Sequence, residues 1–343
     1  MFRSAQTLLV LVGCFAIGCG GSPATRLNGG GSTFVYPMMS KWASEYDKAK
    51  GVKVNYQSIG SGGGIQQMTA KTFDFGCSDA PMNAEQLEKA KQTSGEALHI
   101  PLVMGAVVPA YNLAGVSEPV QFTGPVLADI FLGKIKRWND AALKKLNPNA
   151  TLPDQEIAVV HRSDGSGTTY IWVDYLAKVS PEWKQKVGVG ASVNWPTGVG
   201  QKGNEGVAGQ VKRSAGSIGY IELIYAQQNN IAFGDVVNRE GAPVRASLET
   251  VTAAAAGALS DIPEDLRYSI TNAPGKDSYP ISGTVWAVIY KQQPGGKGQR
   301  VVDFLRWCTH DGQQYAEELH YARLPTGLVE RVEKKLDSVA FSQ

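Results

Sequence analysis

The chain has 343 residues, of which 33 are Lys or Arg and 31 are Asp or Glu, so its formal net charge at pH 7 is only +2. This near balance, without a basic run, argues against a nucleic-acid-binding protein, because contact with a phosphate backbone needs a concentrated positive patch. The length is sufficient for two domains, each with its own hydrophobic core.

Residues 1–18 have the pattern of an export signal. Arg3 precedes an apolar stretch from Leu8 to Ile17, and the small residue Gly18 follows it. About ten apolar residues are too few to cross a bilayer as a helix, which takes about 20. We therefore expect an exported protein that lies in the periplasm or on the cell-surface side of the membrane.

The cysteine after this signal suggests a membrane tether. Residues 16–19, Ala-Ile-Gly-Cys, resemble a bacterial lipoprotein cleavage site, which would make Cys19 the acylated residue. Cys14 is the alternative, since residues 11–14 fit the usual residue types slightly better, but it would leave an apolar core of only about five residues. We favour Cys19, with residues 19–26 as a flexible tether to a lipid anchor.

The first part of the mature chain alternates between strand and helix patterns. Residues 29–34, Gly-Gly-Gly-Ser-Thr-Phe, predict a polar loop ahead of a helix that Pro37 opens. Residues 52–57 predict a half-buried strand, which a second Gly/Ser loop at 58–64 follows. Residues 73–77 predict a short buried strand.

The strongest local signal lies in the middle of the chain. Residues 157–160 predict a buried strand, residues 161–170 a polar loop, and residues 171–178 a helix. Within the loop, Arg162 supplies a planar fork of donors that suits an oxyanion. His161 beside it is more consistent with a supporting or exposed role.

Three Gly/Ser/Thr loops thus precede three helix starts. The first N–H groups of a helix lack internal partners and carry partial positive charge, so each start is a potential anion site. For one loop alone, an ordinary strand-to-helix connection with Ser166 or Asp164 as N-cap is the alternative. Because three such loops occur, we predict that they converge around one small anion.

Two long apolar passages, at 101–112 and at 279–290, predict two chain crossings between lobes, one near 105–112 and one near 272–285. Residues 27–112 together with 273–343 then form lobe I, which is discontinuous in sequence, and residues 113–272 form lobe II. The predicted fold is α/β, with a ligand cleft between two mixed-sheet lobes joined by two hinge crossings. We expect a monomer.

Signatures of enzymes, metals and cofactors are absent or unconvincing. Gly-x-Gly-x-x-Gly at 198–203 matches a dinucleotide fingerprint, but it does not follow a buried strand, so we interpret it as a chance match. The four histidines are scattered, and we expect no catalytic residue, metal or cofactor. Cys77 and Cys308 could form a disulfide, although we favour two buried thiols.

Two carboxylates near the predicted anion site would determine which anions it binds. Asp79 ends a predicted buried strand, and Asp164 lies two residues after Arg162, where it can orient the guanidinium. A carboxylate repels a fully ionised oxyanion but accepts a proton from hydrogen phosphate, so Asp79 would admit phosphate and reject sulfate. Capping of a helix or turn is the alternative role for both residues.

Several motifs together resemble one family, in family order over nearly the whole mature chain. They are Gly-Ser-Thr-Phe at 31–34, Tyr-Gln-Ser-Ile-Gly-Ser-Gly-Gly-Gly at 56–64, Asp-Phe-Gly-Cys-Ser-Asp-Ala-Pro at 74–81, Leu-Gly-Lys-Ile-Lys-Arg-Trp at 132–138, Arg-Ser-Asp-Gly-Ser-Gly-Thr at 162–168 and Gly-Ser-Ile-Gly-Tyr at 216–220. This pattern is similar to the phosphate-binding subunit of the bacterial phosphate ABC transporter. The lipoprotein-type start departs from the freely soluble periplasmic members.

The resemblance implies a fold, a function and a set of site residues. It implies a type II periplasmic-binding-protein fold that binds inorganic phosphate and delivers it to membrane permease subunits for import. The phosphate-binding residues it implies are Thr33, Phe34, Ser61, Asp79, Arg162, Ser166, Gly167 and Thr168, with Asp164 holding Arg162. The alternatives are a binding protein for another oxyanion and a phosphate-ester hydrolase.

Overall fold

The computed structural model describes residues 26–342. The predicted export signal, the Cys14 and Cys19 lipidation sites and most of the predicted tether therefore lie outside the described residues. Arg26, the last residue of the predicted tether, is already part of the first strand. Within residues 26–342, none of the helices combines the length and the apolar character that crossing a membrane would take.

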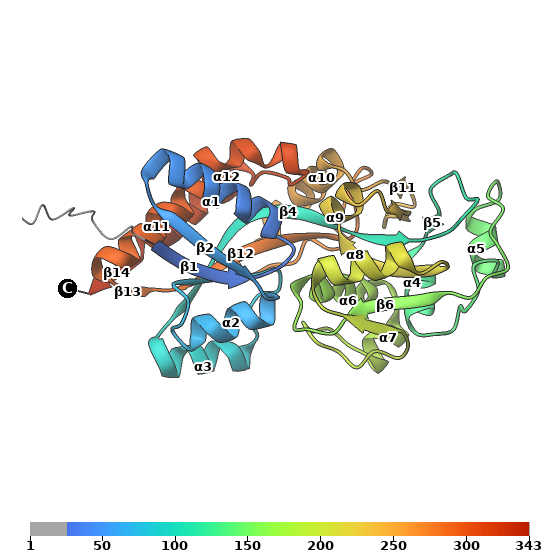
Figure 1. Ribbon diagram of the computed structural model, residues 1–343, viewed down its shortest axis with the longest axis horizontal. Coiled ribbons are helices and arrows are strands. Elements are labelled where there is room, and N and C mark those ends of the chain that lie inside the picture. The colour runs from blue at the N-terminus through green and yellow to red at the C-terminus, as the bar shows by residue number, and fades with distance from the viewer. Residues whose placement is uncertain (1–25, 343) are drawn as a thin grey trace, which may run out of the picture.

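The molecule is a mixed α/β structure with two lobes side by side (Figure 1). Its main sheet has the strand order β2-β1-β3-β12-β4-β8-β6-β7. The first lobe contains β1 (Arg26–Gly31), β2 (Lys53–Ser58), β3 (Phe75–Ser78), β12 (Ser282–Tyr290), α1 (Tyr36–Lys50), α2 (Ser61–Thr69), α3 (Ala84–Ser94), α11 (Gly295–Thr309) and α12 (Thr326–Asp337). In Figure 1, α1, α11 and α12 lie above its strands, and α2 and α3 lie below them.

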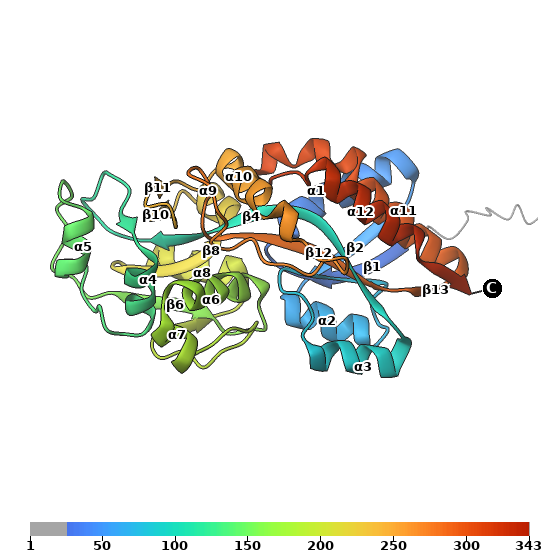
Figure 2. The same cartoon turned by 180° about the vertical axis from the view of Figure 1, so that it is seen from behind.

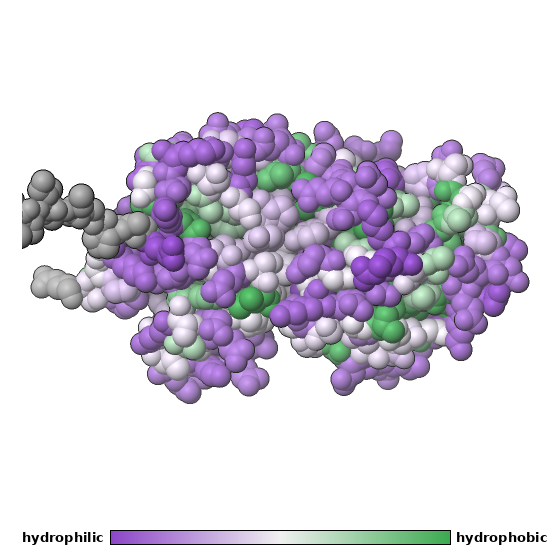
Figure 3. Space-filling model, viewed as in Figure 1, coloured by the Kyte–Doolittle hydropathy of each residue, from purple (hydrophilic) through white to green (hydrophobic). Residues whose placement is uncertain are grey.

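The second lobe repeats this layered arrangement. It contains β6 (Ala158–Arg162), β7 (Val199–Gln201), β8 (Ser217–Glu222), α4 (Gly124–Phe131), α5 (Ala141–Leu146), α6 (Gly167–Val179), α7 (Pro181–Lys186), α8 (Gly203–Arg213) and α9 (Leu223–Gln228). The view from behind shows α4, α6 and α7 gathered near β6 and below β4 (Figure 2). Figure 3 shows polar side chains over most of one face, with an indentation in the lower outline between the lobes.

Shorter elements complete the chain. These are β5 (Gln121–Phe122), β9 (Ala232–Phe233), β10 (Asp235–Val237), β11 (Pro243–Val244), β13 (Gln292–Pro294), β14 (Ala340–Ser342), α10 (Leu248–Ala258) and the 3-10 helices η1 (Leu259–Asp261), η2 (Asp311–Tyr315) and η3 (Glu317–Leu319). Strand β13 pairs with β14, and β5, β10 and β11 form a small sheet of their own.

One strand connects the two lobes. Strand β4 (Ala97–Tyr111) pairs with β12 along Ala97–Ala106 and with β8 along Val107–Tyr111. Both β4 and β12 are buried over almost their whole length, as expected for strands covered on both faces. The predicted apolar passages are therefore adjacent strands, and the first of them begins four residues before the predicted position.

The structure corrects several local predictions, among them the loop at 58–64, of which Ser58 belongs to β2 and residues 61–64 belong to α2. Gly29, Gly30 and Gly31 belong to β1 and not to a loop. Larger residues would not fit there, because a Cβ on Gly29 would lie 2.3 Å from the Phe75 ring and one on Gly31 would lie 2.2 Å from the Cys77 carbonyl oxygen. The glycines thus serve close strand packing. The strand predicted at 73–77 runs from Phe75 to Ser78.

The two described cysteines behave as buried hydrophobic residues. Cys77 and Cys308 are both free and buried, so the alternative of a disulfide between them was wrong. Burial raises the pKa of each thiol, which keeps both in the neutral form at physiological pH.

Candidate functional site

Two of the predicted loops contact each other across the space between the lobes. The Gly62 N–H donates to the Gly165 carbonyl oxygen at 2.8 Å, which joins the start of α2 to the loop before α6. In the first lobe, the Asp79 N–H donates to the Ser61 hydroxyl oxygen at 3.3 Å. The loop at 58–64 therefore touches both the end of β3 and the opposite lobe.

Asn204, in the first turn of α8, connects the third predicted loop, which contains Thr33, to the other two. Its side-chain Nδ2 donates to Thr33 Oγ1 at 2.8 Å and lies 3.1 Å from Thr168 Oγ1. Its backbone N–H also donates to Thr33 Oγ1, at 3.2 Å. All three side chains are fully buried or nearly so. One amide group thus links the loop after β1 to the first turn of α6.

Arg162 occupies the last position of β6, with a side chain only 1% exposed. Its Nε and Nη2 donate to the two carboxylate oxygens of Asp164 at 2.8 and 2.5 Å, and its Nη1 donates to Thr168 Oγ1 at 3.4 Å. This bidentate pair fixes the plane of the guanidinium. Asp164 orients Arg162, as the sequence predicted.

Asp164 stays ionised although it is partly buried. Burial acts to raise its pKa, but the hydrogen bonds and positive charge of Arg162 outweigh that effect and hold the pKa below its ordinary value. The Gly203 N–H also donates to Asp164 Oδ1, at 3.1 Å. Asp164 therefore offsets part of the Arg162 charge at the site.

Asp79 has the opposite environment. Its side chain is buried, and its Oδ1 atom has no hydrogen-bond partner among the described residues. Burial raises the pKa of Asp79 to about 7, against the opposing effects of the Ser32 hydroxyl, the Arg162 charge, and the Ser61 and Thr168 hydroxyls. A buried carboxylate oxygen without a donor is costly, and a ligand that carries a proton would remove that cost.

Helix starts supply further donors. Ser166 is the N-cap of α6 and accepts the Thr169 N–H at 3.0 Å, so the first turn begins at Gly167 and Thr168. A Cβ at Gly167 would lie only 2.4 Å from Asp79 Oδ2, which shows how closely this helix start approaches the carboxylate. The N–H groups at such a start have no intrahelical acceptor and favour an anion.

The structure brings together the residues that the sequence predicted. Hydrogen bonds or short contacts connect Thr33, Ser61, Asp79, Arg162, Gly167 and Thr168, together with Asp164, and Ser166 caps the same helix start. The Phe34 ring lies in the core, with its centroid 6.2 Å from the centroid of the Tyr321 ring, so only the main chain of Phe34 can face a ligand. The His161 ring stacks on Trp195 with ring centroids 4.8 Å apart, and its Nδ1 lies 3.0 Å from the Arg162 carbonyl oxygen, so His161 borders this network at the Arg162 main chain.

Ser32, Asn204 and Tyr220 also belong to the site, although the sequence did not reveal them. The Tyr220 hydroxyl accepts the Arg162 N–H at 3.0 Å and lies 2.6 Å from Thr169 Oγ1. Asn204 directly follows the dismissed Gly-x-Gly-x-x-Gly stretch. That stretch was a usable signal, because its last glycine, Gly203, opens helix α8 beside Asp164.

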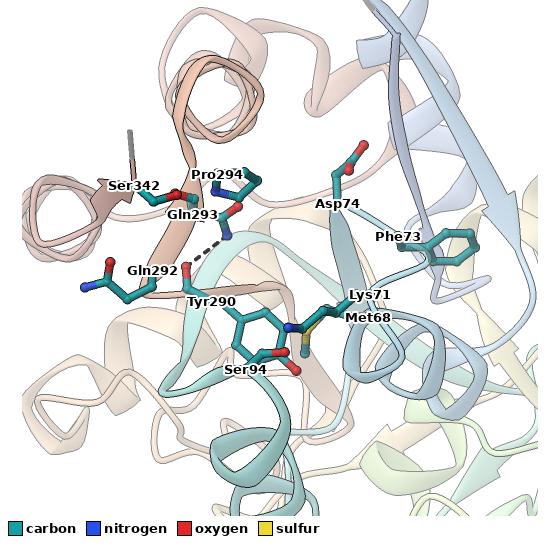
Figure 4. Close-up of a pocket in the computed structure, with 10 residues that line it drawn as sticks. All are labelled: Met68, Lys71, Phe73, Asp74, Ser94, Tyr290, Gln292, Gln293, Pro294 and Ser342. Carbon is teal, nitrogen blue, oxygen red and sulfur yellow. Dashed lines mark hydrogen bonds between the residues drawn. The ribbon is translucent and has the colours of Figure 1, made fainter.

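The arrangement can hold a small tetrahedral oxyanion between the lobes, with one proton acceptor among many donors. It is closed to solvent, since Thr33, Ser61, Asp79 and Thr168 are each at most 2% exposed. A cavity of about 410 Å³ between Met68, Tyr290 and Ser342 lies elsewhere in the first lobe, and none of the predicted site residues lines it (Figure 4). Residues 26–342 contain no cluster of three metal-ligating side chains.

Comparison with known proteins identifies the family. The model of the PBP superfamily domain matches residues 20–311. The "Phosphate-binding protein PstS" of Xylella fastidiosa is 48% identical over 90% of this chain and 84% of its own length. The chain belongs to the PstS family of phosphate-binding proteins. The PstS protein of Pasteurella multocida is 45% identical, over 97% of this chain and 95% of its own length.

Solved structures agree on the fold of this family member. A periplasmic phosphate-binding protein solved with bound phosphate has a TM-score of 0.73 at 20% identity, and the match covers 90% of this chain and 93% of that protein. A candidate phosphate ABC transporter substrate-binding protein from Clostridium perfringens gives 0.64 at 20% identity, over 88% and 100% of the two chains. The two-lobed type II periplasmic-binding fold predicted from the sequence is confirmed.

Proposed function

We propose that the protein binds inorganic phosphate, as hydrogen phosphate, in the closed site between its lobes. The observation that carries this proposal is the buried Asp79 carboxylate, whose Oδ1 has no donor although it lies among hydroxyls near Arg162. Hydrogen phosphate can donate a proton to Asp79 while its other oxygens accept from the remaining groups. Sulfate has no proton to donate at neutral pH, so Asp79 would repel it.

The proposed ligands are those predicted from the sequence: Thr33, Phe34, Ser61, Asp79, Arg162, Ser166, Gly167 and Thr168. Their burial and mutual contacts support this set, and Arg162 is already held in place by Asp164. The site acts by binding alone, so we infer a substrate-binding protein and not an enzyme. The PstS names of its relatives agree with that inference.

The order of magnitude of the affinity can be estimated from the size of the ligand. Five non-hydrogen atoms at about 1.5 kcal/mol each give about 7.5 kcal/mol, which corresponds to a micromolar dissociation constant. Charge-assisted hydrogen bonds from Arg162 and the helix starts replace the hydration that the anion loses. We therefore expect micromolar binding or somewhat tighter.

We further propose that the loaded, closed form is presented to the permease subunits of a phosphate ABC transporter outside the cytoplasmic membrane. The lobes assigned from the sequence, 27–112 with 273–343 and 113–272, would move about the β4 crossing, because that strand belongs to both sheets. An acylated Cys19, or Cys14 as the alternative, would keep the protein at the membrane. Fractionation of cells that carry Cys19→Ser tests the anchor, since release into the soluble fraction supports Cys19 and retention contradicts it.

Titration calorimetry tests the binding function. The purified protein is unfolded, dialysed free of retained phosphate and refolded, and phosphate is then titrated at pH 8. The proposal predicts one site per chain with a micromolar or lower dissociation constant. No heat of binding from protein that has regained its native circular dichroism would contradict it.

A further inference from the structure

Three consecutive carbonyl groups in the loop after β1 each accept a hydrogen bond from a tyrosine hydroxyl. Tyr56 donates to the Ser32 oxygen at 2.9 Å, Tyr225 to the Thr33 oxygen at 2.6 Å, and Tyr321 to the Phe34 oxygen at 2.6 Å. The three bonds span 24, 192 and 287 positions of sequence. Three separate parts of the chain therefore hold the same three peptide groups.

The tyrosines come from different elements. Tyr56 lies on β2 of the first lobe, Tyr321 follows η3 in the C-terminal part, and Tyr225 lies on α9 of the second lobe. Tyr225 and Tyr321 are buried, and burial raises the pKa of all three phenols. Each hydroxyl therefore remains protonated at neutral pH and acts as a donor to the loop.

These bonds act on the peptide groups that the anion would contact. The carbonyl of residue 32 shares its peptide with the Thr33 N–H, and the carbonyl of residue 33 shares its peptide with the Phe34 N–H. A hydrogen bond to a carbonyl oxygen polarises the whole peptide and makes its N–H a stronger donor. The third carbonyl shares its peptide with the Val35 N–H, which donates to Ser32 Oγ at 3.3 Å and closes the turn.

We infer that Tyr56, Tyr225 and Tyr321 are positioning residues of the anion site, which orient and polarise the N–H groups of the loop at 32–35. This inference rests on the proposed binding of phosphate at that loop. Tyr225 has an additional role because it reaches the loop from the opposite lobe. Its bond to the Thr33 oxygen and the Asn204 bond to Thr33 Oγ1 both join one lobe to the other, so separation of the lobes would break them and both would favour the closed state.

Replacing each tyrosine by phenylalanine removes the hydroxyl and leaves the ring. A net hydrogen bond contributes about 0.5–1.5 kcal/mol, so we expect phosphate to bind about two- to tenfold more weakly in Tyr56→Phe, Tyr225→Phe and Tyr321→Phe. In stopped-flow measurements, Tyr225→Phe should show the largest increase in the phosphate dissociation rate. The reason is that its bond crosses between the lobes.

Tyr279→Phe is the matched control. The Tyr279 hydroxyl is equally buried and donates to a carbonyl oxygen, that of Val107, at 3.0 Å, but it does not touch the loop. We expect this variant to lose a similar amount of thermal stability and to keep the wild-type affinity. If the three loop variants bind phosphate as tightly as Tyr279→Phe does, the positioning role is refuted.

Amide proton shifts separate this inference from the proposed function. In ¹⁵N-labelled protein without phosphate, removal of a tyrosine hydroxyl should move the Thr33 or Phe34 amide proton upfield, because its peptide is less polarised. Unchanged shifts would contradict the polarisation even if phosphate binds. Changed shifts in a protein that does not bind phosphate would leave the tyrosine bonds established and refute the proposed function alone.

Discussion

If phosphate binds as proposed, the protonation state of Asp79 determines which anions the site accepts. Its ordinary pKa is 3.8, and burial raises the pKa to about 7. Above that pH the carboxylate repels sulfate, whereas below it the neutral carboxyl group can donate a hydrogen bond to a sulfate oxygen. The proposed role of Asp79 thus predicts that the site excludes sulfate at pH 8 and accepts it under mildly acidic conditions.

Sulfate binding should therefore depend on pH. We expect sulfate affinity to increase by about tenfold or more between pH 8 and pH 6, with uptake of one proton per sulfate bound. Calorimetry in buffers of different ionisation enthalpy measures both quantities. A sulfate affinity that is equal at the two pH values would show that Asp79 does not face the anion.

Sequence reasoning predicted the charged residues that the structure brings together, but it missed the neutral residues that connect them. Arg162, Asp164 and Asp79 were predicted because charge in a Gly/Ser-rich loop has a specific chemical use. Asn204 contacts Thr33, which lies 171 positions earlier in the sequence, and no local sequence pattern predicts a contact between residues so far apart. Ser32 was close in sequence to a predicted ligand, but a lone serine in a glycine-rich stretch has many ordinary roles.

At the scale of elements, the start of α2 depends on a glycine that no other residue can replace. Gly60 precedes the helix with φ +86° and ψ 152°, a region that only glycine adopts readily. A Cβ at this position would lie 2.3 Å from Asp164 Oδ2. The helix start, the carboxylate and the Arg162 guanidinium are therefore packed as one unit across the lobes.

Gly60→Ala should disturb the packing of the α2 start against Asp164 and Arg162. We expect phosphate to bind at least about tenfold more weakly, because the new methyl group displaces Asp164 from Arg162. Gly51→Ala is the control, since Gly51 also has a positive φ of 67° but has nothing within 4 Å of the added Cβ. Both variants should lose stability in thermal melts, and only Gly60→Ala should lose affinity. Equal phosphate affinities for the two variants would contradict this coupling.

Elements with clear periodicity or punctuation were predictable. The helix α1, the helix α6 and the β4 crossing follow from apolar spacing, capping residues and an apolar run. The triple glycine at 29–31 was misinterpreted as a loop because glycine usually marks turns. Its true role, close packing of β1 against Phe75 and Cys77, depends on residues about 45 positions away and so could not be seen locally.

On the scale of the whole molecule, the closed arrangement of the lobes buries Asp79. If opening hydrates Asp79, its pKa returns toward 3.8, whereas in the closed form it is about 7. The closed form without phosphate is therefore favoured below about pH 4 and loses that advantage as pH rises through about 7. Phosphate would restore the closed form, because it would donate a proton to the ionised carboxylate.

Small-angle scattering can detect how the balance between the open and the closed form changes with pH. Without phosphate, we expect a larger radius of gyration at pH 8 than at pH 5, and with phosphate a compact particle at both values. Asp79→Asn, which cannot ionise, should remove the pH dependence of the ligand-free protein. A radius that does not change with pH in the wild type would indicate that Asp79 does not oppose closure.

The two-lobed architecture itself was predictable, because two long apolar runs separated by a full α/β series leave few other topologies. The exact register could not be predicted. Strands β4 and β12 pair with a register shift between Val285 and Trp286, which no local sequence pattern indicates. Sequence patterns thus indicated a two-lobed fold, whereas the strand register depends on tertiary packing.

The ratio of phosphate to sulfate affinity at pH 8, compared between the wild type and Asp79→Asn, tests the proton-acceptor role most directly. We expect the wild type to prefer phosphate strongly. In Asp79→Asn, phosphate should bind at least about tenfold more weakly and sulfate more tightly, because the amide no longer carries the charge that repels it. An unchanged ratio in the variant would contradict selection of hydrogen phosphate by Asp79.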